Sequence, residues 1–119
     1  MLLKDYPQSA EAGKAKALVT ELLDLRANAD YAEAMKLLEA EKYQEAIAAL
    51  KRITERYPGT YTELAAYCNL GLTYERVSDW RPSAEYYGKV LEKGGDAIEN
   101  YDVVSFAKLH RDWIVANKL

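Results

Sequence analysis

The sequence predicts an all-α protein built from antiparallel helix-turn-helix units. Ala contributes 18 of the 119 residues, and Leu, Glu and Lys are also abundant, a composition that favours helices. Neither Gly nor Pro occurs between residues 14 and 57. Apolar side chains recur every three or four residues, as they do on one face of a helix, and alternating β-branched runs are absent.

The first predicted helix runs from about Ser9 to Glu41. Leu18, Leu22 and Leu25 begin a three-to-four spacing of apolar and small residues that continues past Asn28 without a change of phase. One long helix, either straight or bent near Asn28, is therefore favoured over two short helices.

Two further helices are expected near residues 43–57 and 61–78. Tyr57-Pro58-Gly59 is the stop between them, and Thr60 with Glu63 matches the capping-box pattern of a helix start. The apolar face of the 43–57 helix comprises Tyr43, Ala46, Ile47, Leu50, Ile53 and Tyr57.

The last two helices are predicted near residues 80–93 and 97–116. Asp79 is the start signal of the former, and Pro82 is tolerated because a first-turn residue has no intrahelical amide bond to lose. Gly94-Gly95 ends it, and Asp96-Ala97-Ile98-Glu99 repeats the capping-box pattern just before the final helix.

Two segments of the chain repeat one another at an offset of 37 residues, since residues 79–87 align with residues 42–50. Aromatic, small and large apolar residues coincide in this alignment. The period is slightly longer than the roughly 34 residues of a tetratricopeptide repeat, which the chain resembles over residues 27–95. The resemblance rests on Tyr67, Asn69-Leu70-Gly71-Leu72-Thr73-Tyr74, Asp79-Trp80, Ser83 and Ala84-Glu85-Tyr86-Tyr87, and on Ala34, Leu37, Tyr43, Ala46, Leu50, Ile53 and Pro58 in the first copy.

The resemblance implies one domain, a short α-solenoid of tetratricopeptide type. Gly71 would be its close-packing glycine and Ser83 its small residue at the start of the second helix, whereas Glu41 and Ser78 replace the usual turn glycines. The Tyr-Pro stops resemble bacterial envelope members of the family. The single domain is expected to have four parts. Residues 1–26 comprise the end of a preceding unit and the first part of the long helix, and residues 27–60 form repeat 1. Residues 61–95 form repeat 2, and residues 96–119 form a capping helix or the start of a third repeat.

Composition argues against several classes of function. The 16 Lys and Arg residues against 19 Asp and Glu leave no basic surplus for nucleic acid. One Cys and one His cannot build a zinc site, and there is no apolar run long enough to enter a membrane. We predict a soluble protein of the bacterial periplasm, envelope or cytoplasm, without metal or cofactor.

No enzymatic activity is expected, because phosphate-binding and nucleophile motifs are absent. Val103, Phe106, His110 and Trp113 follow helical spacing, so His110 is interpreted as a packed or rim histidine. Cys68 lies in the first helix of repeat 2 without neighbouring cations in sequence, and is interpreted as a semi-buried structural thiol.

The first helices of tetratricopeptide repeats line a concave groove that receives an extended or helical peptide. Some members capture a C-terminal carboxylate with Lys, Arg and Asn, but only Asn69 fits that set here, so a partly apolar peptide or helix is the better match. The resemblance maps the groove to Tyr31, Met35, Leu38, Glu39, Ala65, Cys68, Asn69, Leu72, Glu75 and Arg76.

We therefore expect a non-enzymatic scaffold that binds a protein or peptide partner in this groove. The alternative is an architectural or self-associating segment of a longer repeat protein, without an independent ligand. Self-association would use apolar residues expected to be exposed at the two ends: Leu18, Leu22 and Leu25, and Phe106, Trp113 and Ile114.

Overall fold

The computed structural model describes the backbone of residues 10–119 and the side chains of residues 25–119. No strand occurs over these residues, which confirms the all-α prediction. The elements are α2 (Ala10–Glu39), α3 (Tyr43–Arg56), α4 (Tyr61–Arg76), α5 (Trp80–Gly94), the short 3-10 helix η1 (Ile98–Asn100) and α6 (Tyr101–Lys118).

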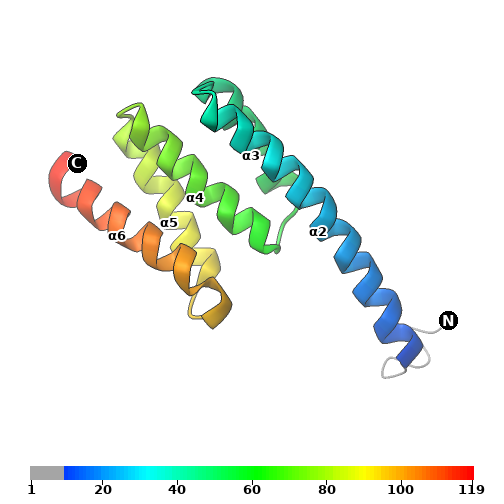
Figure 1. Ribbon diagram of the computed structural model, residues 1–119. Helices are drawn as coiled ribbons and strands as arrows, with labels where there is room; N and C mark the ends of the chain where they lie inside the picture. The colour runs from blue at the N-terminus through cyan, green and yellow to red at the C-terminus, as the bar shows by residue number, and fades with distance from the viewer. Residues whose placement is uncertain (1–9) are drawn as a thin grey trace.

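The helices form a two-layer stack (Figure 1). Helices α2, α4 and α6 lie side by side in one layer, and α3 and α5 lie behind them. Each helix packs against the next along the chain, and α4 also contacts both α2 and α6. This is the antiparallel arrangement expected of stacked helical repeats.

Helix α2 is continuous from Ala10 to Glu39, so the prediction of one long helix is confirmed over these residues. Its first part extends beyond the other helices (Figure 1). Ser9 and the side chains of Leu18 and Leu22 lie outside the described residues. Ala27 and Ala34 are fully buried in an apolar cluster that α2 forms with α3 and α4.

The turns within both helix pairs have the same geometry. Glu41 has a φ angle of 59° and Ser78 one of 60°, in the left-handed region that favours glycine. At each turn the residue's own N–H donates to the carbonyl three residues earlier at 3.0 Å, and the next N–H donates to the carbonyl five residues earlier at 2.9 Å. These are the two hydrogen bonds of a Schellman motif, repeated 37 residues apart.

The predicted capping box at the start of α4 is confirmed, with one variation. The Thr60 hydroxyl accepts the N–H of Glu63 at 3.1 Å, as expected. The Glu63 carboxylate accepts the N–H of Gly59 at 3.1 Å, one residue before the helix cap. The hydrogen bond of the Glu63 carboxylate therefore also stabilises the turn that precedes α4.

The prediction that the final helix starts near residue 97 is wrong. Residues 98–100 form η1, and α6 begins at Tyr101 without a side-chain cap. The Asn100 amide instead donates to the carbonyl of Gly94 at 3.1 Å. This bond satisfies a free carbonyl at the end of α5 and holds Asn100 there just before α6 starts.

Two apolar clusters share α4. The first joins α2, α3 and α4, and it includes the predicted apolar face of α3. The second joins α4, α5 and α6. Leu70 belongs to the first cluster and Leu64 to the second, so α4 contributes to both. Ile114 is fully buried in the second cluster, so its predicted exposure at the C-terminal end is wrong.

Helices α4 and α5 approach closely at Gly71. A Cβ atom at this position would lie 2.7 Å from the ring of Tyr87. The Ser83 hydroxyl donates to the Gly71 carbonyl at 2.7 Å. The two small residues therefore take the close-packing roles that the resemblance implies.

Candidate functional site

The residues predicted to line the groove lie on two neighbouring helices of one layer (Figure 1). The exposed members are Glu39 and Arg76, and most of the others are partly buried. The set comprises Tyr31, Met35, Leu38 and Glu39 on α2, and Ala65, Cys68, Asn69, Leu72, Glu75 and Arg76 on α4.

Leu38 and Cys68 are buried and belong to the two apolar clusters. Burial raises the pKa of the Cys68 thiol from 9.0 to about 11. The thiol therefore stays protonated near neutral pH and is a weak nucleophile. Both side chains stabilise the stack, and the surface open to a partner is formed by the other members of the set.

Asn69 joins α4 to α2. Its Nδ2 atom donates to the Tyr31 hydroxyl at 2.7 Å and to the carbonyl of Ala65 at 2.9 Å. A carbonyl can only accept, so the contact with Ala65 identifies the nitrogen end of the amide. Both donors of Asn69 are thus engaged within the protein, and its Oδ1 atom is the end of the side chain suited to accept a hydrogen bond from a partner.

Tyr31 provides a complementary polar group. Burial raises the pKa of its hydroxyl, so the group stays protonated. Because its oxygen accepts from Asn69, its own O–H is directed elsewhere and is suited to donate. Tyr31 and Asn69 together present one donor and one acceptor at the junction of the first two repeats.

Glu75 is the centre of a second polar junction. Its Oε1 atom accepts the Tyr87 hydroxyl at 3.0 Å and lies 2.9 Å from Nδ1 of His110. The Phe106 ring stacks on the His110 ring, with centroids 4.0 Å apart. One carboxylate therefore links α4, α5 and α6, and the rim position predicted for His110 is accompanied by a specific bond that its sequence spacing did not indicate.

Helix α6 extends the predicted surface by three residues that were not assigned to the groove. At the 37-residue offset, Asn69 corresponds to Phe106, Leu72 to Leu109 and Arg76 to Trp113. Their exposed fractions are 37%, 71% and 51% respectively. The offset itself is the pattern that would have identified them, had it been continued beyond the second repeat.

The repeat offset also produces an apolar row across three helices. Met35, Leu72 and Leu109 are successive equivalents, one on each of α2, α4 and α6. Met35 and Leu72 are partly buried, and Leu109 is exposed. Helices α2, α4 and α6 are neighbours in one layer (Figure 1), so the three equivalent residues lie on adjacent helices.

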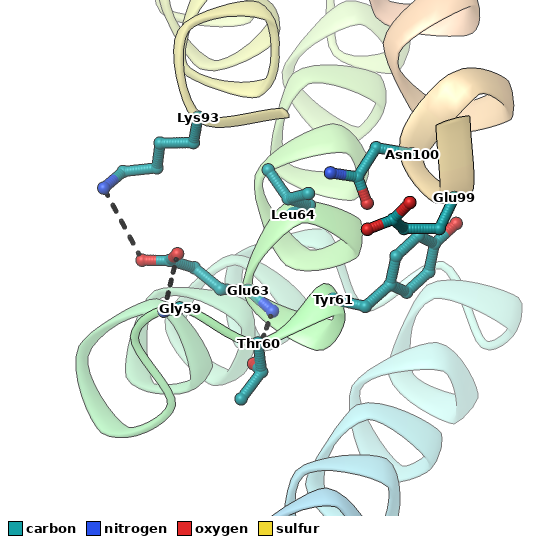
Figure 2. Close-up of a pocket in the computed structure, with 8 residues that line it drawn as sticks. All are labelled: Gly59, Thr60, Tyr61, Glu63, Leu64, Lys93, Glu99 and Asn100. Carbon is teal, nitrogen blue, oxygen red and sulfur yellow. Dashed lines mark hydrogen bonds and ion pairs between the residues drawn. The ribbon is translucent and has the colours of Figure 1, made fainter. Parts of the chain in front are cut away.

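A recess of about 440 Å³ lies at the start of α4, outside the predicted groove (Figure 2). Within it, the Glu63 carboxylate accepts the Gly59 N–H and lies 3.8 Å from Nζ of Lys93. The charged group of Glu63 is therefore already paired within the protein. Across residues 25–119, every buried side-chain polar atom has a hydrogen-bond partner. The recess therefore lies where the Glu63–Lys93 ion pair joins the start of α4 to the end of α5.

Within the described part of the chain, no three His, Cys, Asp or Glu side chains are grouped as a metal site. None of the described helices combines the length and apolar character needed to cross a membrane.

Residues 24–60, which span the second half of α2, all of α3 and the turn after it, match the family model described as tetratricopeptide repeat. Neither the curated proteins nor the solved structures contain a significant match to the chain. The match overlaps the predicted first repeat. The resemblance to bacterial envelope proteins and the compartment stay predictions.

Proposed function

We propose, from the premise that residues 24–60 are a tetratricopeptide repeat, that this chain is a non-enzymatic scaffold with a defined partner-binding face. Tetratricopeptide repeats mediate protein–protein interaction. The proposed face is formed by α2, α4 and α6, and its ligand is a partly apolar peptide or helix of a partner protein.

The apolar row of Met35, Leu72 and Leu109 carries this proposal. One apolar residue of the row lies on each of three neighbouring helices, so a segment bound across α2, α4 and α6 has an apolar side chain available on each. Phe106 adds an aromatic edge on α6, where it is partly exposed. Burial of apolar surface is the dominant favourable term in most protein–protein association.

Polar groups beside the row suit the backbone of an extended or helical ligand. Asn69 Oδ1 accepts, the Tyr31 hydroxyl donates, and the exposed Arg76 guanidinium donates to a carbonyl or carboxylate. Such groups fix the orientation of a ligand whose affinity comes from apolar contacts. The combination supports recognition of a mixed sequence rather than of a terminal carboxylate alone.

The experiment identifies a partner by cross-linking in the native host and then measures its affinity for purified variants. Leu72→Asp and Leu109→Asp are each expected to weaken binding by about 1 kcal/mol or more, since they place a charge in the apolar row. Lys51→Ala, on the exposed surface of α3, is the control and should bind normally. The reverse pattern, with loss only in Lys51→Ala, contradicts the proposed face.

Asn69→Ala needs its own control, because it also breaks the bond to Tyr31. Tyr31→Phe removes this internal bond and the Tyr31 donor but retains the Asn69 amide. In the Tyr31→Phe background, Asn69→Ala should weaken binding further if Oδ1 contacts the partner, with helicity equal in both. No further loss in the double variant would assign Asn69 to the stack alone.

The alternative, an architectural or self-associating segment, is supported by a recess of about 590 Å³ between α5 and α6. Gly88 and Arg111 in its lining correspond, at the 37-residue offset, to Lys51 and Tyr74. In the second repeat, Tyr86 of α5 stacks on Tyr74 with ring centroids 5.6 Å apart. By this equivalence, a further helix would lie on Arg111 of α6 as α5 lies on Tyr74 of α4. Such a helix would come from a longer array or from a second copy of the chain, and it would fill the recess.

Sedimentation separates the two functions. Self-association through α6 predicts a dimer at high micromolar concentration that is weakened by Trp113→Ala, because Trp113 is half exposed. A monomer at all concentrations, unchanged by this substitution, argues against self-association.

A further inference from the structure

The two tryptophans of the chain meet at one end of the stack. Trp80 is the first residue of α5, and Trp113 lies near the end of α6. Their ring centroids are 6.1 Å apart and their planes are inclined at 59°. Two inclined indole rings form the walls of an open corner rather than a flat stack. Trp113 is 51% exposed, so the corner is open to solvent.

The ammonium group of Lys118 already occupies this corner. Its Nζ atom lies 5.2 Å from the centroid of Trp80 and 5.8 Å from that of Trp113. Both distances are within the range at which the negative face of an indole attracts a cation. None of the ion pairs found over residues 25–119 involves Lys118.

Lys118 is an occupant that a ligand can displace. It is the last residue of α6, its side chain is exposed, and its long stem has many rotamers. Trp80 is held more firmly, because it packs against the second apolar cluster. One wall of the corner is thus anchored in the fold, whereas the occupant is an exposed side chain at the end of a helix.

We propose that Trp80 and Trp113 form a cation-binding site for an alkylammonium group, supplied by a lysine side chain of a partner protein, and that Lys118 competes for this site from within the chain. The ligand class follows from the group that the corner already holds. An ammonium on an alkyl stem reaches both indole faces without a carboxylate partner. The site does not depend on partner binding by the apolar row.

The test uses the full chain and the indole N–H resonances, of which a protein with two tryptophans has two. The probe is Nα-acetyl-lysine methylamide, and its uncharged counterpart is Nα-acetyl-norleucine methylamide. Sodium chloride at equal ionic strength is the reference. The lysine probe should shift both indole resonances in a saturable manner, whereas the norleucine probe and the salt should not.

Lys118→Gln removes the internal competitor and should bind the lysine probe about threefold or more tightly than the wild type, the factor expected for loss of one exposed cation–π contact. The matched control is Lys93→Gln, whose side chain pairs with Glu63 instead. It should bind as the wild type does. Trp113→Leu removes one wall and should abolish the probe-dependent shift of Trp80.

Three results would overturn the proposal: equal shifts with lysine and norleucine probes, equal affinities of Lys118→Gln and Lys93→Gln, or a Trp80 shift that survives Trp113→Leu. Lys118 is exposed, so the comparison of lysine variants remains decisive even if Trp113→Leu fails to fold. Leu72→Asp on α4 distinguishes this site from the apolar row. It should lower partner affinity but leave the response to the probe unchanged.

Discussion

Nδ1 of His110 lies 2.9 Å from Oε1 of Glu75, although 35 residues separate them in sequence. The same oxygen accepts the Tyr87 hydroxyl, so one carboxylate holds three helices in register. Both partners of the His–Glu pair are about three-quarters buried, at 28% and 24% side-chain exposure. Hydrogen bonds to a charged group in such surroundings contribute more than those at an open surface.

Glu75→Ala should lower the free energy of unfolding by about 1–2 kcal/mol, because it removes both bonds and leaves the Tyr87 hydroxyl without its acceptor. Chemical denaturation followed by circular dichroism measures the change. Glu85→Ala, on the exposed surface of α5, is the control and should stay within about 0.5 kcal/mol of the wild type. Equal effects of the two substitutions would show that the hydrogen bonds of Glu75 do not contribute measurably to the free energy of unfolding.

Glycine at the two turns should stabilise the protein. Glu41→Gly and Ser78→Gly each relieve a left-handed φ angle, and we expect a gain of about 0.5–1 kcal/mol apiece. Glu41→Ala is the matched control, since alanine retains the Cβ atom and should bring no gain. Thermal unfolding of the three variants checks this, and a loss of stability in both glycine variants would contradict it.

Two glycines in neighbouring helices should respond to alanine in opposite directions. Gly71→Ala places a Cβ atom 2.7 Å from the Tyr87 ring and should destabilise the protein by about 1–3 kcal/mol. At Gly88 the nearest atom would be 3.5 Å away, on the flexible Arg111 side chain. Gly88→Ala should therefore stabilise α5 by about 0.5–1 kcal/mol through helix propensity. Urea midpoints of the two variants that move in the same direction would refute the comparison.

The buried Cys68 thiol predicts a dependence of stability on alkaline pH. Burial raises its pKa in the folded state to about 11, whereas the unfolded thiol titrates near 9.0. The folded state then binds more protons above pH 9, so the free energy of unfolding should fall as pH rises from about 9 to 11. Cys68→Ala should have a shallower slope over this window. Denaturant titrations at several pH values measure it, and identical slopes would exclude the thiol as the cause.

Reactivity of the same thiol gives an independent check. At pH 8 the folded protein should be alkylated by iodoacetamide much more slowly than the protein in 6 M guanidinium chloride, because the thiolate is the nucleophile. Gly71→Ala should react faster than the wild type, since it opens more often. Equal rates in folded and unfolded protein would show that the thiol is accessible.

The candidate site could be predicted only in part. The groove residues on α2 and α4 followed from the family resemblance, and the same 37-residue offset extends to Phe106, Leu109 and Trp113 on α6. The sequence did not indicate that polar groups of this site are hydrogen-bonded to one another within the protein. Asn69 and Tyr31 are 38 residues apart, and no local spacing indicates that their side chains meet.

Local chemistry determined most of the helix boundaries. A hydrogen bond in a helix joins residues four apart, and capping and breaking act over a few neighbours, as at Thr60 and Glu63. The sequence alone therefore predicted α2 to α5 and the repeat that relates them. Tertiary packing decided the start of α6, the burial of Ile114 and Cys68, the junction at Glu75 and the corner between Trp80 and Trp113. Each of these depends on contacts between different helices, whose relative placement is set by side-chain packing across the whole stack.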